Sequence, residues 1–477
     1  MTDSGGERRI IAALAIGLFC VQLDFFGLSL ALPRMADDFH QSTTNLQWVL
    51  SAYMITIGAA LIPAGRLGDL RGRRRMVIVG LVVFGGASTV CGLAQSLVML
   101  IAFRAVQGLG AATLMSVSVA AISNTVRAER RASAIGILFG LANIGTALGP
   151  FVGGLLTEQV SWRWIFLLNV PLVMLAIVLC ARWLPETRDE AASPRIDVAG
   201  LVTVALAVAA IAYAADRGAA WGWTSARTLG TFALGAVLLV TFAQIEKRVR
   251  NPLIDLSLLR NRPFVLITTG GTVSNIAYVS TVLAVTVYLQ DARGLSPVVA
   301  GVVFLAPSVA VAFAGPIAGR LAEWRPVQFL LPVTLLAAAA GLLIVSFVHA
   351  WGYYVPALGL TGFVLGLGWT LPNIGTQAVV DRRRAGEAAG VNLTAIVTIG
   401  GISVALAGTL IEIYGSGTTG AADGARTVIR IVAILAGMTG VALLGNLAAP
   451  RLRRAFDHVV RPHPTETAYR EALGRPD

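Results

Sequence analysis

The chain alternates between runs of about twenty mostly apolar residues and short segments that carry most of its charge. A run of that length crosses the hydrocarbon core of a bilayer as a helix. Of the 477 residues, 56% are hydrophobic and 13% are charged, which is about half the charged fraction of a soluble globular protein. This composition excludes an ordinary soluble enzyme and a disordered chain, and it predicts an all-α integral membrane protein.

The apolar runs predict fourteen transmembrane helices. The predicted spans are residues 10–33, 48–65, 76–93, 97–122, 132–156, 165–180, 198–215, 228–245, 264–289, 298–321, 327–347, 353–380, 388–413 and 428–449. Cys20, Cys91 and Cys180 all lie inside these spans, without the spacing of a disulfide framework or a metal site. We therefore interpret the cysteines as packing residues.

The positions of the basic residues indicate how the helices are oriented. If the N-terminus is cytoplasmic, 29 of the 37 Lys and Arg residues fall in cytoplasmic segments and seven fall in outside loops. Cytoplasmic loops of membrane proteins carry such an excess. We therefore expect both termini in the cytoplasm and a multi-pass protein of the cell membrane. The net charge of +12 belongs to these loops, so it does not indicate nucleic-acid binding.

An internal repeat relates the two ends of the chain. Residues 64–69, Ala-Gly-Arg-Leu-Gly-Asp, correspond to residues 318–323, Ala-Gly-Arg-Leu-Ala-Glu, at an offset of 254. The same offset aligns Gly136 with Gly390. The repeated unit contains six predicted helices, and the seventh and eighth helices fall between the two copies.

The repeat predicts four regions. They are an N-terminal six-helix bundle at 1–183, two inserted helices with flanking cytoplasmic loops at 184–262, a C-terminal six-helix bundle at 263–449 and a basic cytoplasmic tail at 450–477. Two parallel six-helix halves, related by an axis along the membrane normal, are typical of transporters that rock around a site at their interface. We therefore expect a substrate site between the halves, near the middle of the bilayer.

The sequence contains no motif for a chemical reaction that could supply the energy for transport. A nucleotide-driven pump needs a phosphate-binding loop ending in Gly-Lys-Ser or Gly-Lys-Thr, whereas the single lysine, Lys247, follows Glu246. All four histidines lie outside the predicted spans, which leaves no obvious base for a hydrolase inside the membrane. We expect a transporter rather than an enzyme, driven by an existing ion gradient and needing no cofactor or metal.

Two ionisable residues lie well inside predicted spans, Asp24 in the first and Arg104 in the fourth. A charge in the middle of a bilayer costs about 2.5–3.5 kcal/mol on insertion scales, so each charge needs a partner or a function. From the outer ends of their helices, Asp24 is about 14 Å deep and Arg104 about 10 Å deep. We predict that they pair and that Asp24 carries a proton; the alternative is a static pair that locks two helices. The repeat aligns Asp24 with Tyr278, so we expect no buried charge in the second half.

Four segments carry recognisable patterns. They are residues 65–75 after the second span, residues 100–108 with Arg104 and Gln107, the glycines and proline of residues 145–154, and residues 162–171 with Trp-Arg-Trp-Ile-Phe and Asn-Val-Pro. In this order they resemble the motifs of the major facilitator superfamily, and more closely those of its fourteen-helix drug:proton antiporters. The likeness covers nearly the whole chain. It implies proton-coupled transport by alternating access, with Asp24 and Arg104 as the coupling residues.

The resemblance also implies two elements that change during transport. The first is the loop that contains Gly65, Asp69, Gly72 and Arg73. Its aspartate can accept hydrogen bonds from a neighbouring arginine and face a helix N-terminus, where negative charge is favoured. The second is a hinge that contains Gly145, Gly149, Pro150, Gly153 and Gly154. The alternatives are a loop that only sets topology and a plain kink where two helices cross.

Polar and aromatic residues inside the two repeats are candidates for lining the substrate cavity. They are Gln22, Tyr53, Gln107, Asn143, Asn275, Tyr278, Asn373 and Asn392. Each of them could instead form a hydrogen bond between helices. The antiporters usually have Thr two residues after the first-helix Asp, where this chain has Phe26, so we expect a more apolar cavity. Some relatives that export divalent cations carry another acid in the second half; its absence here favours monovalent lipophilic cations or neutral amphiphiles.

The sequence therefore predicts a proton-coupled exporter of drugs or other amphiphilic small molecules. Two transport functions remain open, a dedicated exporter of one natural product or lipid-like metabolite and a proton-coupled uptake symporter. A non-transporting membrane scaffold is the alternative outside transport, and buried charge argues against it. The expected partners are a small amphiphilic substrate, protons and membrane lipids, with no nucleic acid, and we expect a monomer.

Overall fold

The computed structural model describes residues 4–28, 31–41, 43–190, 197–249, 252, 254, 256–415 and 420–448, so the predicted tail at 450–477 lies outside the described residues. Within them, fourteen helices are long and apolar enough to cross a membrane, which confirms the predicted number. The α-helices are α1 (Ser4–Leu28), α2 (Leu32–Phe39), α3 (Thr43–Arg71), α4 (Arg73–Gly92), α5 (Leu97–Thr125), α6 (Arg131–Gln159), α7 (Arg163–Leu167), α8 (Asn169–Trp183), α9 (Val198–Trp221), α10 (Ala226–Arg248), α11 (Arg262–Val287), α12 (Pro297–Trp324), α13 (Val327–Phe347), α14 (Trp351–Ala378), α15 (Ala385–Gly415) and α16 (Gly420–Ala448).

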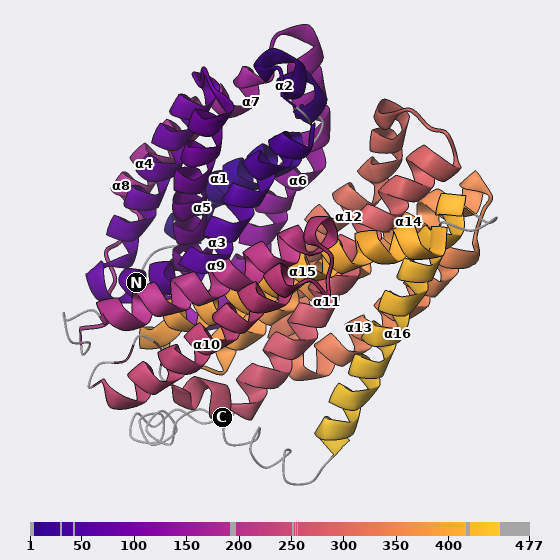
Figure 1. The fold of residues 1–477 in the computed structure, drawn as a ribbon. Helices are drawn as coiled ribbons and strands as arrows, with labels where there is room; N and C mark the ends of the chain where they lie inside the picture. Colours follow the sequence, from indigo (N-terminus) through magenta and orange to yellow (C-terminus); the bar gives the residue numbers. More distant parts are fainter. Residues whose placement is uncertain are drawn as a thin grey trace.

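The helices form two bundles with the same internal packing (Figure 1). In the first bundle, α1 packs on α6 and α8, and α5 packs on α3 and α4. In the second, α11 packs on α15 and α16, and α14 packs on α12 and α13. Each of these four contacts in one bundle therefore has its counterpart in the other, and the repeat in the sequence is also a repeat in three dimensions.

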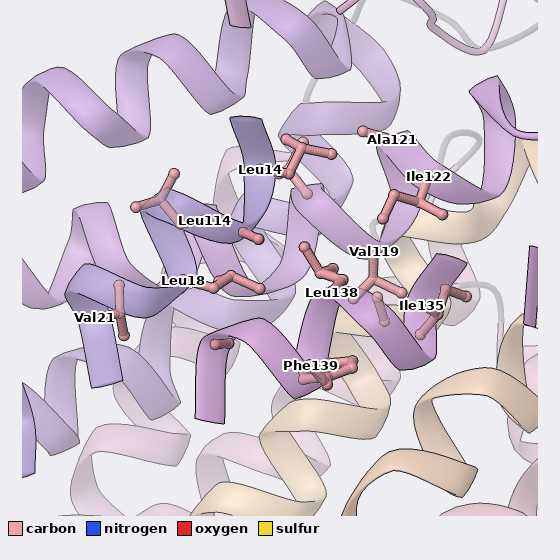
Figure 2. Packing of buried hydrophobic residues seen from close by; sticks show 14 of the residues in the cluster. Leu14, Leu18, Val21, Leu114, Val119, Ala121, Ile122, Ile135, Leu138 and Phe139 are labelled. Carbon is pink, nitrogen blue, oxygen red and sulfur yellow. The ribbon is translucent and has the colours of Figure 1, made fainter. Parts of the chain in front are cut away.

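The core of the first bundle is formed by α1, α5 and α6. Figure 2 shows apolar side chains of these three helices meeting, among them Leu14, Leu18, Leu114, Ile122 and Leu138. Each of these five residues is at most 3% exposed. Lipid tails are as apolar as leucine, so helices in a membrane associate through close packing and polar contacts rather than through exclusion of water. The close fit of these side chains therefore holds the bundle together.

The two most extensive helix crossings between the bundles are those of α3 with α15 and of α6 with α12. At the first crossing, Gly65 of α3 lies against the backbone of Gly386 in α15. At the second, Gly136 of α6 lies against Gly315 and Gly319 of α12. A side chain at any of these positions would meet backbone atoms of the other bundle. The repeat offset relates Gly65 to Gly319, so the two crossings are equivalent by the internal symmetry.

Helices α9 and α10 have no counterpart in the repeat and pack against each other as a hairpin. In Figure 1 this hairpin lies across the region where the two bundles meet, and α9 packs on both α3 and α15. Ser51 of α3 donates a hydrogen bond to Asp216 of α9 at 2.6 Å. The indole of Trp223, between α9 and α10, donates to the hydroxyl of Thr409 in α15 at 2.8 Å. The hairpin therefore touches both halves.

The first span begins and ends earlier in the sequence than predicted. Helix α1 ends at Leu28, and the separate helix α2 begins at Leu32 with Pro33 at its second position. Proline is tolerated in the first turn of a helix because its missing N–H has no helical partner there. The apolar run continues through the break, so hydrophobicity alone could not locate it. Asp24 therefore lies four residues, or about 6 Å, from the end of its helix.

The predicted loop at residues 65–75 is almost entirely helical. Helix α3 continues to Arg71 and α4 begins at Arg73, which leaves Gly72 alone between them. Gly72 has a φ of 105°, a conformation that residues with a Cβ rarely adopt. Gly72 therefore makes the tight turn between α3 and α4.

Candidate functional site

Asp24 and Arg104 form a buried ion pair between α1 and α5. Both side chains are 0% exposed. Arg104 also donates from Nη1 to the Gln107 side chain at 2.8 Å and from Nε to the carbonyl of Val49 in α3 at 3.0 Å. The structure thus brings the two predicted coupling residues together, at depths that differ by less than one helical turn. The guanidinium also connects three helices of the first bundle.

Two amide side chains complete the environment of the carboxylate. Gln107 and Asn169 each donate to Asp24 Oδ1 at 3.1 Å. Both amides also donate to the hydroxyl of Ser88, at 3.2 and 3.3 Å respectively. Sequence analysis assigned Gln107 to the substrate cavity and gave no role to Ser88 or Asn169. The signal for Asn169 was its place in the Asn-Val-Pro segment, which starts α8 beside the Asp24 carboxylate.

Aromatic rings surround the remaining face of the arginine. The guanidinium carbon of Arg104 lies 4.0 Å from the ring centroid of Tyr53 and 5.7 Å from that of Phe166. A cation over an aromatic face gains about 0.5–2 kcal/mol, more when water is absent. Arg104 Nη2 has no hydrogen-bond partner among the described residues, so these rings are its main contact on that side. The cluster of Asp24, Arg104, Gln107, Asn169 and Ser88, here called the charged cluster, is net neutral and closed to solvent.

A chain of aromatic contacts leads from the charged cluster to the space between the bundles. The ring of Tyr53 stacks on Phe25 at 6.3 Å, and Phe25 contacts Phe26 edge-on at 5.1 Å. Asp24 and Phe26 are two residues apart on α1, so they point to nearly opposite sides of the helix. Asp24 faces the interior of its own bundle, whereas Phe26 lines the cleft described next.

The cleft has a volume of about 190 Å³ and lies between the two bundles. Its walls come from α1 and α6 on one side and from α11, η3 (Tyr288–Ala292), α12 and α14 on the other. The residues that line it are Phe26, Thr146, Pro150, Tyr278, Thr281, Val282, Val285, Thr286, Gln290, Ala300, Gly301, Phe304, Pro307, Ser308, Leu358, Thr361, Gly362 and Leu365. Most of them belong to the second bundle, and they lie in the halves of their helices farthest from Gly72.

One of the eight predicted cavity residues lines this cleft, namely Tyr278. Gln22 lies just behind the wall and donates to the hydroxyl of Thr146 at 2.9 Å. Tyr53 and Gln107 belong to the first bundle, where they contact Arg104. Asn143 is 3% exposed on α6, and its amide nitrogen has no hydrogen-bond partner in the part of the chain that the structure describes.

The three predicted asparagines of the second bundle are also buried inside it. Asn275 donates to the carbonyl of Ile396 at 2.9 Å, and Asn392 donates to the side chain of Asn373 at 3.2 Å. These contacts join neighbouring helices of one bundle. In this conformation the three asparagines therefore act as packing groups, the alternative that sequence analysis left open.

The opposite end of the interface is closed, and Asp69 joins the two halves there. Its Oδ1 accepts from Arg73 Nη2 at 2.6 Å and from the backbone nitrogen of Gly386 at 3.1 Å, while Oδ2 accepts from the backbone nitrogen of Glu387 at 2.9 Å. Arg73 donates in turn to the carbonyl of Arg383 at 3.0 Å. Negative charge is favoured at a helix N-terminus. The helix N-terminus expected beside Asp69 is that of α15, in the other half.

Further charged groups are buried near the helix ends. Glu7, Asp69, Arg73 and Glu387 are each at most 3% exposed. The expectation of a second half without buried charge is therefore wrong. Helix α15 begins at Ala385 rather than at residue 388, so Glu387 falls in its first turn, where it pairs with Arg384 at 2.8 Å. This charge lies at the end of its helix, not at the depth of Asp24.

The predicted hinge in α6 packs against α1. Gly145 lies against Phe19, Gly149 against Phe26, and Gly153 against Gly27. Gly154 is half-buried on the same helix. The helix continues through Pro150, whose side chain reaches the cleft. These small residues let α6 approach the backbone of α1 closely, on the helix that carries both Asp24 and Phe26.

Comparison with known proteins agrees with this geometry. Residues 14–408 match the sequence profile of the Major Facilitator Superfamily. The chain is 35% identical over 385 residues to the multidrug resistance protein Stp of Mycobacterium tuberculosis, covering 80% of this chain and 71% of that protein. It is 34% identical over 461 residues to the puromycin resistance protein pur8 of Streptomyces alboniger, covering 92% and 90%. It is 31% identical over 407 residues to the tetracenomycin C resistance and export protein of Streptomyces glaucescens, covering 84% and 75%.

Solved structures share the fold at low sequence identity. The human organic anion transporter MFSD10 (TETRAN) superposes with a TM-score of 0.67 at 15% identity, covering 92% of this chain and 99% of that one. The proton:xylose symporter XylE superposes with a TM-score of 0.63 at 14% identity, covering 92% and 95%. The profile match and the resistance and export proteins above the 30% level lead to one conclusion: the chain is a transporter of the Major Facilitator Superfamily, of the multidrug efflux type.

Proposed function

We propose that this protein exports amphiphilic small molecules from the cytoplasm in exchange for protons, with Asp24 as the proton carrier. The observation that carries the proposal is the pairing of Asp24 with Arg104 in a bundle whose opposite face borders the cleft. Under the proposal the protein works as a monomer, uses no cofactor, and has both termini in the cytoplasm. The end closed by Asp69 then faces the cytoplasm, and the cleft opens to the outside.

In this outward-facing arrangement the cleft is where a substrate would leave. A proton that reaches Asp24 neutralises the carboxylate and removes the charge that holds Arg104. The arginine then lacks its counter-charge in a low-dielectric environment, which favours a rearrangement of α1 against α5. Since Phe26 lies two residues from Asp24 and lines the cleft, movement of α1 changes the shape of the substrate site. Proton binding and substrate release are thereby coupled through one helix.

The contacts of Asp69 support a matching role at the closed end. In the outward-facing arrangement its carboxylate accepts hydrogen bonds from the first turn of α15, and Arg73 donates to the preceding turn. These contacts cross between the halves, so they must break when the cytoplasmic end opens. We propose that Asp69, Arg73 and the glycine crossings form the cytoplasmic gate, and that Gly72 lets α3 and α4 move as one unit.

A narrow substrate range is the second candidate. Two relatives are named for resistance to a single compound, puromycin and tetracenomycin C, whereas Stp is named for multidrug resistance. The cleft in this chain would serve a dedicated exporter as well as a broad one. Uptake by symport is not favoured, because the relatives are named for resistance and export.

The test is gradient-dependent uptake into inside-out membrane vesicles that contain the full chain. Fluorescent amphiphiles are supplied outside the vesicles, which corresponds to the cytoplasm, with an inward-acidic gradient. We expect uptake that stops when a protonophore collapses the gradient. Uptake that is insensitive to the gradient, in vesicles shown to contain the protein, would contradict proton coupling.

A further inference from the structure

The wall of the cleft carries polar groups but no charge. All 18 of the described residues that line it are uncharged at neutral pH. Aromatic rings face it from both halves, Phe26 from the first and Tyr278 and Phe304 from the second. Such a surface combines large apolar contact area with a few polar groups that fix orientation, as small-molecule sites do.

Among the described residues, one buried hydroxyl in the wall lacks a hydrogen-bond partner. Thr281 is 5% exposed and its Oγ1 has no partner within the described residues. By contrast, the hydroxyls of Thr286 and Thr361 donate to backbone carbonyls of their own helices, at 2.7 Å each. A buried polar atom without a partner costs about 1–3 kcal/mol. A ligand with a hydrogen-bonding group near Thr281 would recover that loss.

Asp24, two residues from Phe26 on α1, is not available to a bound cation, and Asp291, which follows Gln290 in η3, is not among the residues that line the cleft. Asp24 faces the interior of its bundle, is 0% exposed, and accepts hydrogen bonds from Arg104, Gln107 and Asn169. Its charge is already balanced by the arginine. A cationic substrate in the cleft would therefore lose hydration without gaining an anionic partner.

Contacts with the aromatic rings do not fully compensate a cationic substrate for the missing anionic partner. A cation over an aromatic face gains about 0.5–2 kcal/mol, whereas a charge at the centre of the bilayer costs about 2.5–3.5 kcal/mol on insertion scales. A neutral ligand makes the same ring contacts without the cost of placing a charge in the bilayer. The comparison favours neutral molecules over cations of equal size.

From these observations we propose that the cleft selects uncharged aromatic amphiphiles that carry a hydrogen-bonding group, and that Thr281 recognises this group. The inference rests on the proposed export function and narrows its substrate class. Under this inference the proton and the substrate bind at different places, because the proton binds on one face of α1 and the substrate borders the other face. Substrate and proton then do not compete for the same carboxylate.

The test uses two probes that share a fluorophore and differ in charge. Dansylamide is neutral and has a sulfonamide group that forms hydrogen bonds; a dansyl amide with a trimethylammonium-ethyl group is cationic. We expect the purified full-length protein to bind dansylamide at least tenfold more tightly, as measured by dansyl fluorescence. Equal affinity, or tighter binding of the cationic probe, would overturn the proposal.

A single substitution in the cleft tests whether charge is the cause. Thr286→Asp places a carboxylate in the wall, and Thr286→Asn is the matched variant without charge. We expect the aspartate variant to shift the ratio of the two dissociation constants toward the cation by about tenfold or more, and the asparagine variant to keep the ratio near that of the unmodified protein. Equal shifts in both variants would show that shape, not charge, sets the preference, and would overturn the inference.

Thr281→Val tests the hydrogen bond separately. We expect it to weaken dansylamide binding about fivefold, the effect of one hydrogen bond of ordinary strength. Unchanged dansylamide affinity would remove Thr281 from the proposal. Binding is measured without a gradient, so its outcome is distinct from that of the vesicle assay. Selective binding without gradient-driven uptake would refute the export proposal alone, whereas uptake with a preference for the cation would refute this inference alone.

Discussion

The two halves of the molecule share one packing plan but differ in what fills equivalent positions. The repeat aligns Asp24 of α1 with Tyr278 of α11. In the first half this position holds a buried carboxylate bound to Arg104. In the second half the equivalent tyrosine lines the cleft, together with Leu358, which occupies the position of Arg104 at the same offset. Under the proposed function, the comparison indicates a division of roles, with the first half organised around charge and the second around the substrate.

The interface between the halves remains nearly symmetric in spite of this divergence. Each crossing pairs the second helix of one repeat with the fifth helix of the other, and each uses glycine where backbones meet. The interiors of the two bundles differ in their residues while the two crossings remain alike, because the interiors and the crossings have different structural requirements. A crossing needs close approach in one conformation and separation in the other, and small residues suit both.

The largest effects on the proposed division of roles are expected from substitutions of the two equivalent residues, Asp24 and Tyr278, that remove the carboxylate of the first or the hydroxyl of the second. Asp24→Asn removes the titratable group, and we expect gradient-driven accumulation to fall at least a hundredfold while downhill movement of substrate persists. Tyr278→Phe removes only a hydroxyl at the equivalent position, and we expect weaker substrate affinity with dependence on the gradient retained. Vesicle uptake, with and without a protonophore, measures both.

Loss of gradient dependence in Tyr278→Phe, or normal accumulation by a well-expressed Asp24→Asn, would contradict the division. Both variants need to be present in the membrane at the level of the unmodified protein. The asparagine in Asp24→Asn is similar in size and can keep hydrogen bonds to its neighbours, which limits effects on folding.

The next prediction concerns the two glycine crossings, because the two halves have this packing feature in common. Gly65→Val and Gly136→Val each place a side chain against backbone atoms of the other half. We expect either variant to prevent closure at that end and to reduce transport at least tenfold. Distances between spin labels across the closed end should increase. Gly86→Val is the matched control, since a Cβ added there has nothing within 4 Å.

If Gly65→Val and Gly136→Val leave both the distances and the transport rate at the level of the Gly86→Val control, the crossings do not form the gate. An effect of only one of the two would show that the interface is less symmetric than its backbone suggests.

A smaller effect is expected at Asn169, which supports the carboxylate without titrating. Its amide donates to Asp24 at 3.1 Å, and a hydrogen bond to a charged group contributes about 1.5–3 kcal/mol. Two other hydrogen bonds to the carboxylate, from Arg104 and Gln107, remain in Asn169→Ala, so we expect coupled transport to fall about fivefold to tenfold and its pH profile to change. Asn446→Ala, on the exposed surface of α16, is the control. An unchanged pH profile in Asn169→Ala would assign the residue a packing role only.

Sequence patterns predicted much of this site, but unevenly. The ion pair between Asp24 and Arg104 followed from two charges at similar depth, because each needs a partner in lipid. The contacts of Asp69 with a helix N-terminus followed from local charge. The cavity residues were predicted less well, since of eight candidates Tyr278 alone lines the cleft. A polar residue in an apolar run has two outcomes, a contact inside the bundle or a place on the cleft wall, and composition does not distinguish them.

The sequence by itself determined the number of spans, the six-helix repeat and the positions of the two charges deep inside the spans, Asp24 and Arg104, because run length, spacing and charge are properties of the chain alone. The tertiary structure decided which face of each helix meets which neighbour. It placed Asn169 and Gln107 on the Asp24 carboxylate, directed Phe26 to the cleft, and brought Gly65 against Gly386. Helices that are apolar on all sides carry no periodic signal of orientation, so only the packing of one helix on another could decide these contacts.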